Sequence, residues 1–160
     1  MTPDQNRIEA SVQIERPVGE VFGFYRDFRN LPRFLGDVMA VEPAGPRTTR
    51  WTIQGPFGIQ THWTVKVTDE LSDTVIRYET VSSASVRWEI YFSPAAGRKK
   101  TEVREVMISP LGPLGRMALA LIGKFPDREV SANLHRLKQI LETGKITDTS
   151  YAVAGKFPQP

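Results

Sequence analysis

Glu105 is the acidic residue whose position suggests chemistry. In the strand expected over residues 101–109 it alternates in step with Met107, which places its carboxyl group on the face turned toward the protein interior. A carboxylate facing an apolar space is unfavourable unless it is paired or protonated. Such a group can orient a ligand hydroxyl or exchange a proton, so Glu105 is a candidate catalytic and ligand-binding residue. The alternative is a slip or bulge that turns Glu105 outward, because Val106 and Ile108 compete for the inward positions.

Four large aromatic residues occupy the apolar positions of separate predicted strands: Trp51, Trp63, Tyr78 and Trp88. Rings on the concave face of a sheet either pack into a solid core or line a ligand pocket. A shallow sheet crossed by a single helix rarely fills completely, so we expect a cavity beside these rings. Methionines such as Met107 and Met117 suit the lining of a cavity because their side chains adapt to irregular shapes, although they also fill gaps in cores.

Other kinds of chemistry have no support in the sequence. His62 lies on a polar strand position and His135 on the polar side of the predicted C-terminal helix, and neither has a partner at metal-ligand spacing. There are no cysteines, no glycine-rich nucleotide-binding motif and no GxSxG nucleophile motif. We therefore expect no metal, no cofactor and no nucleophilic catalysis by a serine or a cysteine.

Periodicity defines the elements that position these residues. Residues 8–14 alternate as a half-buried strand, and residues 18–25 and 27–35 each carry a short helical stripe. From Val38 to Ser109 the period is two, interrupted by turns rich in proline and glycine. Six strands joined by short loops predict an antiparallel meander with one apolar face.

The C-terminal part of the chain has the longest helical periodicity. Apolar residues recur over residues 113–124 and again over 127–142, but the two stripes lie on different sides of the axis and a proline separates them. We predict two helices, of which the second, containing Leu134, packs on the sheet. The first, containing Met117 and Leu121, is expected either to pack on the rim of the sheet or to act as a lid. A contact with lipid or with a second chain is a further alternative for the first helix.

Length and composition are those of one globular domain, which we place at residues 1–145 and which a loosely held tail follows at 146–160. The formal charge is +3, and the basic run at residues 98–100 is expected at a hairpin tip. Three positive charges are too few to indicate nucleic-acid binding, and we predict that the protein binds no nucleic acid. No segment is apolar enough for a signal peptide or a membrane span, so we expect a cytoplasmic protein without integral membrane association. We expect a monomer or a weak dimer.

Three segments, ERPVGEVF at 15–22, FRNLPRF at 28–34 and LHRLKQILETG at 134–144, carry a family resemblance. Together with the order of the elements, they resemble the START-like, or helix-grip, superfamily and its polyketide cyclase/dehydrase and lipid-transport group. The similarity covers roughly residues 7–145. It implies an α+β fold in which a curved seven-stranded antiparallel sheet grips a long C-terminal helix, with two short helices after the first strand. It also implies an elongated apolar cavity, in which members carry lipids, sterols or polyketides and some catalyse aromatisation or cyclisation.

The function predicted from these observations is binding or transport of a hydrophobic small molecule of lipid, polyketide or aromatic type. The alternative is a cyclase/dehydratase-type enzyme in which the same cavity folds the substrate and Glu105 transfers a proton. A third hypothesis is an interaction module whose exposed helix, around Leu119, docks on a partner protein. The predicted ligand-binding residues are Trp51, Trp63, Tyr78, Trp88, Glu105, Met107, Met117, Leu121 and Leu134.

Overall fold

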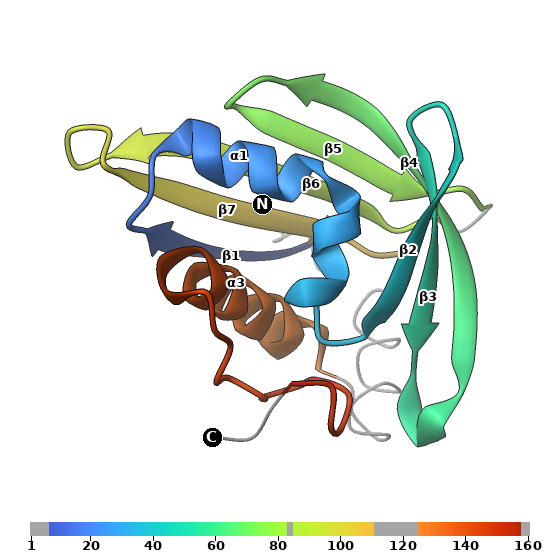
Figure 1. Ribbon diagram of the computed structural model, residues 1–160. Helices are drawn as coiled ribbons and strands as arrows, with labels where there is room; N and C mark the ends of the chain where they lie inside the picture. Colours follow the sequence, from blue (N-terminus) through green and yellow to red (C-terminus); the bar gives the residue numbers. More distant parts are fainter. Residues whose placement is uncertain (1–6, 83–84, 111–124, 158–160) are drawn as a thin grey trace, which may run out of the picture.

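The computed structural model describes residues 7–82, 85–110 and 125–157 (Figure 1). The described residues form one seven-stranded sheet with the strand order β1-β7-β6-β5-β4-β3-β2. Strands β2 to β7 follow one another as an antiparallel meander and β1 pairs with β7, which confirms the predicted fold class. The strands are β1 Arg7–Ile14, β2 Val38–Gly45, β3 Thr48–Gln54, β4 Gln60–Leu71, β5 Val75–Thr80, β6 Arg87–Ala95 and β7 Lys100–Ile108.

Two short helices connect β1 to β2, as predicted. The first, α1 (Val18–Arg26), crosses the inner side of β6 and β7 and buries Tyr25 completely (Figure 1). The second, η1 (Phe28–Arg33), is a 3-10 helix beside β2, and it contains Pro32, which cannot donate a helical hydrogen bond. The two helices therefore close one end of the concave face.

The long helix α3 (Pro126–Thr143) matches the helix predicted at residues 127–142. Pro126 fits the first turn of a helix, where the missing N–H would have no partner within the helix. Gly144 ends the helix with a φ of 77°, a left-handed conformation that favours glycine. The other predicted helix, at 113–124, lies outside the described residues.

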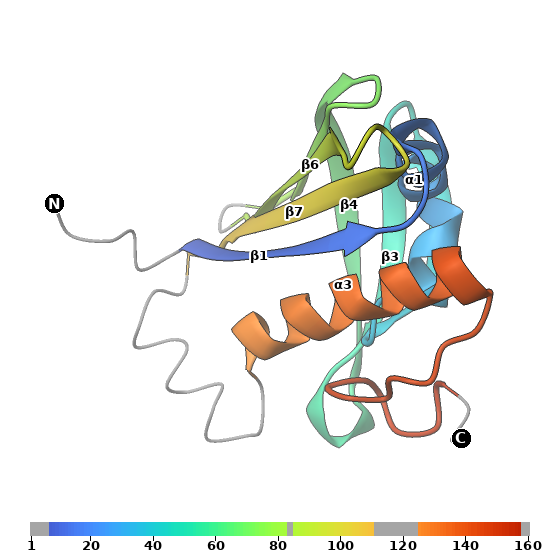
Figure 2. The ribbon, with the colours of Figure 1, turned by 90° about the vertical axis from the view of Figure 1, so that its left-hand side faces the viewer.

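The apolar stripe of α3 packs along β1, at one edge of the sheet (Figure 2). Val130, Leu134 and Leu137 of this stripe are all buried, as are Ile8 and Ile14 of β1. Because the helix follows the edge strand, it does not cover the inner face of the central strands. The rest of that face meets α1, η1 and the cavity described below.

Arg136 of α3 is fully buried and connects three segments of the chain. Its Nε donates to the carbonyl of Phe34 (2.8 Å), its Nη1 to the carbonyl of Ser150 (2.7 Å) and its Nη2 to Oδ1 of Asn133 (2.6 Å). Burial lowers the pKa of the Arg136 guanidinium, and this fork of hydrogen bonds offsets the loss of its hydration. The guanidinium therefore fixes the loop before β2 and the C-terminal segment to α3.

Residues 146–157, which belong to the predicted C-terminal tail, make specific contacts with the loop before β2. The N–H of Val153 donates to the carbonyl of Gly36 (2.9 Å), and the Lys156 ammonium donates to two backbone carbonyls in the loop at 35–38. The segment is held by backbone hydrogen bonds and by the cations of Arg136 and Lys156 instead of an apolar stripe. A search for hydrophobic periodicity cannot detect that kind of packing.

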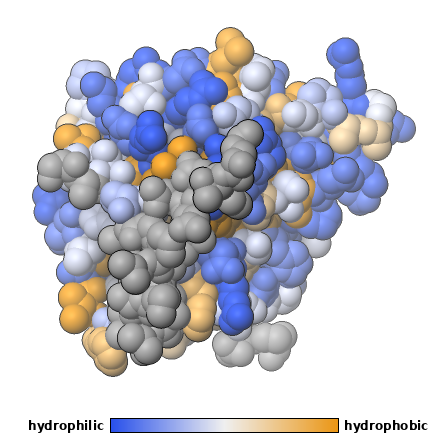
Figure 3. Space-filling view, turned by 180° about the vertical axis from the view of Figure 1, so that it is seen from behind, coloured by the Kyte–Doolittle hydropathy of each residue, from blue (hydrophilic) through white to orange (hydrophobic). Residues whose placement is uncertain are grey.

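The described apolar side chains are concentrated inside the molecule. They form one continuous core that includes residues of α1, η1, α3 and every strand. None of the described helices has the length and apolar character needed to span a membrane. Seen from behind, the described surface is mostly hydrophilic and its hydrophobic side chains form small separate groups (Figure 3).

At Gly36 the loop before β2 lies close to the C-terminal segment, and this glycine provides a test of that packing. A Cβ at Gly36 would lie 2.8 Å from Nη2 of Arg136 and 2.8 Å from the carbonyl oxygen of Tyr151. We predict that Gly36→Ala lowers the free energy of unfolding by about 2 kcal/mol, measured by urea denaturation.

Gly23→Ala in α1 is the matched control, because a Cβ at Gly23 meets no atom within 4 Å. Alanine is a better helix former than glycine, so this variant should be as stable as the wild type or more stable. If the two alanine variants were equally stable, the C-terminal segment would not pack against the loop at Gly36.

Candidate functional site

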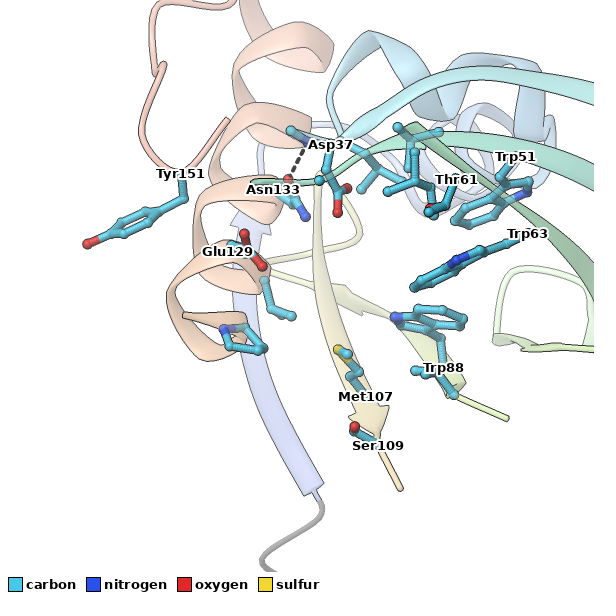
Figure 4. A pocket seen from close by; sticks show the side chains of 18 of the residues that line it. Asp37, Trp51, Thr61, Trp63, Trp88, Met107, Ser109, Glu129, Asn133 and Tyr151 are labelled. Carbon is cyan, nitrogen blue, oxygen red and sulfur yellow. Dashed lines mark hydrogen bonds between the residues drawn. The ribbon is translucent and has the colours of Figure 1, made fainter. Parts of the chain in front are cut away.

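A cavity of about 500 Å³ lies between the inner face of the sheet and the first turns of α3 (Figure 4). Strands β3 to β7, the loop at 35–38 and the turn at 55–59 supply the other walls. Most of its surface is apolar. The volume and the apolar walls are typical of pockets for small organic molecules.

The aromatic residues predicted to line a cavity form one wall, opposite α3 (Figure 4). The strand register brings them together, because Trp51 pairs with Trp63 across β3 and β4, and Tyr78 pairs with Trp88 across β5 and β6. The rings of Tyr78 and Trp88 stack with centroids 5.2 Å apart, and the ring of Trp51 lies 6.0 Å from that of Trp88. The indole N–H of Trp51 donates to Thr49 (2.9 Å), which fixes the orientation of that ring.

Glu105 takes the inward position that its alternation predicts. The register of β7 with β1 and β6 continues without a shift through Glu105, so the alternative of a bulge is excluded. The residue is 4 % exposed and lies on the cavity wall. Burial raises the pKa of the Glu105 carboxyl to about 8, and the nearby negative charge of Asp37 adds to this effect. At neutral pH the carboxyl group is therefore largely protonated.

A pair of tyrosine hydroxyls lies beside Glu105. The hydroxyl oxygens of Tyr25, on α1, and Tyr78, on β5, are 2.7 Å apart, and both side chains are buried. Burial raises the pKa of each phenol well above its ordinary value, and the charge of Glu105 contributes to both shifts. Sequence reasoning did not assign Tyr25 to the site, although the helical stripe at 18–25 places it on the buried side.

The wall formed by α3 and the loop before β2 is more polar, and sequence reasoning missed it. Asn133 and Glu129 lie one turn apart on α3, and Asp37 precedes β2 (Figure 4). Oδ1 of Asn133 accepts the N–H of Gly36 (2.9 Å), which positions the loop that carries Asp37. Tyr151 of the C-terminal segment is at the rim, and its ring points away from the cavity. The spacing of four between Glu129 and Asn133 was the signal available in the sequence.

The structure places most of the predicted ligand-binding residues on the cavity. Leu134 is an exception: it is 2 % exposed and belongs to the core between α3 and the sheet, further along the helix than the residues that face the cavity. Met117 and Leu121 lie outside the described residues. Those on the cavity wall are Trp51, Trp63, Tyr78, Trp88, Glu105 and Met107.

The two histidines lie away from the cavity. Nδ1 of His62 is 3.2 Å from the hydroxyl of Thr52, and Nδ1 of His135 is 2.7 Å from a carboxylate oxygen of Asp148. Both contacts are exposed. Among the described residues, no group of three or more histidine, cysteine or acidic side chains could hold a metal ion.

The raised pKa of Glu105 makes the stability of the protein depend on pH. The folded protein holds this proton up to about pH 8, whereas a glutamate in the unfolded chain loses it near its ordinary pKa of 4.5. The stabilisation from the proton is therefore complete below that ordinary value and is lost as the pH rises toward 8. We predict that Glu105→Gln removes this loss of stability. Between about pH 5 and pH 8 the free energy of unfolding of the wild type should fall by about 3 kcal/mol more than that of the variant.

The measurement is urea denaturation of both proteins at the two pH values. Glu102→Gln is the control, because Glu102 lies on the same strand with its side chain on the opposite face, and it should follow the wild type. Parallel pH dependence in the wild type and Glu105→Gln would show that the Glu105 carboxyl titrates normally.

Solved structures with this fold come from several bacteria. A protein of Deinococcus radiodurans, DR_A0006, superposes with a TM-score of 0.67 at 22% identity, over 86% of this chain and 98% of that one. The Zhui aromatase/cyclase of Streptomyces sp. R1128 superposes with a TM-score of 0.66 at 15% identity, over 86% of this chain and 96% of that one. The di-domain ARO/CYC protein BexL, from the BE-7585A biosynthetic pathway, superposes with a TM-score of 0.65 at 20% identity. The match covers 85% of this chain and 46% of BexL. At these identities the similarity shows the fold alone.

No curated protein matches the sequence significantly. A family model described as polyketide cyclase/dehydrase and lipid transport, in contrast, matches residues 5–142. That range includes the whole sheet and nearly all of α3. The chain therefore belongs to the polyketide cyclase/dehydrase and lipid-transport family.

Proposed function

We propose that the protein reversibly binds a hydrophobic small molecule in the cavity between the aromatic wall and α3. The main support for the proposal is the cavity of about 500 Å³ beside Trp51, Trp63 and Trp88. Three indoles provide a large apolar surface that would otherwise be expected to pack into a solid core. Membership of a family that includes lipid transport supports the same function.

Apolar burial is sufficient for useful affinity in such a cavity. A ligand that buries about 300 Å² of apolar surface gains roughly 7 kcal/mol at about 25 cal/mol per Å². Part of this free energy is lost when the ligand is immobilised. Affinities in the micromolar range then need no dedicated polar contact, and such affinities permit both uptake and release.

A second candidate function is catalysis of the cyclase/dehydratase type. Its support is Glu105, a buried acid whose pKa of about 8 suits proton transfer near neutral pH, and the similarity to the Zhui aromatase/cyclase. The Glu105→Gln variant separates the two functions. A carrier retains its affinity for the ligand, whereas an enzyme loses far more in turnover than in affinity.

Filling the cavity tests the proposed function. We predict that Met107→Trp weakens binding of the neutral fluorescent probe N-phenyl-1-naphthylamine at least tenfold, because the larger side chain takes up space in the cavity beside Trp88. The measurement is a titration that follows the fluorescence of the probe. Circular dichroism of the variant checks that it is folded.

Leu71→Trp is the matched control, since Leu71 is 59% exposed at the end of β4 and away from the cavity. This variant should bind the probe as the wild type does. Equal binding by the folded Met107→Trp variant, or no binding by the wild type, would refute the cavity as the ligand site. Native mass spectrometry of protein purified from its own host would then identify any small molecule that it carries.

A further inference from the structure

Three neighbouring residues that line the cavity carry polar groups: Tyr78 a hydroxyl, Trp88 an indole N–H and Glu105 a carboxyl. Tyr78 pairs with Trp88, Trp88 pairs with Met107, and Glu105 precedes Met107 by two residues on the same face of β7. Trp88 and Glu105 are therefore diagonal neighbours across β6 and β7, with Cα atoms about 7–8 Å apart. The nitrogen-bearing edge of Trp88 is turned toward the cavity (Figure 4).

Each of these groups has hydrogen-bonding capacity that the described residues do not use. One of the two hydroxyls of Tyr25 and Tyr78 donates a hydrogen bond to the other across 2.7 Å, so the second hydroxyl still has an O–H that can donate. Trp88 is 9% exposed and Glu105 is 4% exposed, and both residues line the cavity. Among the described residues, every fully enclosed side-chain nitrogen or oxygen has a hydrogen-bond partner. The polar atoms of Trp88 and Glu105 are therefore accessible from the cavity, where a ligand can bind them.

The surroundings of Glu105 keep its carboxyl group uncharged near neutral pH. Asp37 faces it from the loop before β2, and Glu129 faces the same cavity from α3. The phenols of Tyr25 on α1 and Tyr78 on β5 are also close enough to interact with Glu105, and they stay neutral because burial raises their pKa values. The same burial raises the pKa of Glu105 to about 8, so its carboxyl group carries an O–H that can donate.

We propose that Tyr78, Trp88 and Glu105 form a donor subsite that binds an uncharged oxygen acceptor on the ligand, such as the carbonyl of a ketone or quinone. The inference rests on the proposed function, because it names the ligand class for the same cavity. An indole N–H, a carboxylic O–H and a phenolic O–H are three donors, and a carbonyl oxygen accepts hydrogen bonds without donating any. A carboxylate ligand would bring a second negative charge toward Asp37, and an ammonium group would require Glu105 to ionise.

The test compares 2-acetylnaphthalene with 2-ethylnaphthalene, which have similar shapes and differ in the carbonyl oxygen. Their affinities for the full chain are measured by isothermal titration calorimetry at about pH 6.5 and about pH 9, on either side of the Glu105 pKa of about 8. At the lower pH we expect the ketone to bind about tenfold more tightly, the advantage of one good hydrogen bond. At the higher pH, ionised Glu105 no longer donates, and most of that advantage should be lost.

Variants at two positions of β7 sharpen the comparison. Glu105→Gln retains an uncharged N–H donor of similar size, so its preference for the ketone should persist at both pH values. Glu105→Leu has no donor, so its preference should be reduced several-fold at both pH values. Glu102→Gln, on the outward face of β7, is the control and should behave as the wild type does.

Equal affinities of the two naphthalenes for the wild type at about pH 6.5 would overturn the donor subsite and leave the apolar cavity in place. Tighter binding of 2-naphthoate or of 2-naphthylmethylamine than of the ketone would also overturn it, in favour of a charged ligand. If neither naphthalene binds at either pH, the donor subsite and the proposed function both fail.

Discussion

The position of α3 along the edge strand β1 is the constraint on which the rest of the structure depends. One helix buries one apolar stripe, and here that stripe, with Val130, Leu134 and Leu137, is used against the β1 side of the sheet. As a result α3 does not cover the inner face of the central strands, although their inner positions carry large rings. The cavity exists because α1 and η1 close one end of the concave face and leave the space beside the first turns of α3 open.

Arg136 keeps α3 in that position. A buried guanidinium is stabilising only when its donors find acceptors, and three segments of the chain supply them: Phe34, Asn133 and Ser150. The same contacts fix the loop that carries Asp37 and the segment that carries Tyr151, both of which border the cavity. The shape of the polar wall is thus determined by interactions outside the cavity, in the packing of the C-terminal segment.

The sequence predicts the elements that bury apolar residues in a regular period. The alternation around Trp63 and Trp88 and the stripe of α3 each identify the correct face, and the inward position of Glu105 follows from the same rule. The polar wall could not be predicted in this way, because Asp37 reaches the cavity from an irregular loop. The contacts of residues 146–157 could not be predicted for a related reason, since hydrogen bonds to backbone carbonyls leave no hydrophobic pattern. Leu134 was predicted to bind the ligand but lies in the core. Periodicity identifies the inner face of a helix, but it does not show which residues on that face contact the core and which contact the cavity.

The central claim is that the space between the indoles and α3 is open to a ligand. The most direct measurement is a crystal structure of the protein soaked with a brominated 2-acetylnaphthalene, in which anomalous scattering locates the bromine. Our account predicts a bromine peak inside the cavity, between Trp88 and Asn133. Side chains that fill this space, with the indole rings packed against α3 and no bromine peak between them, would contradict it.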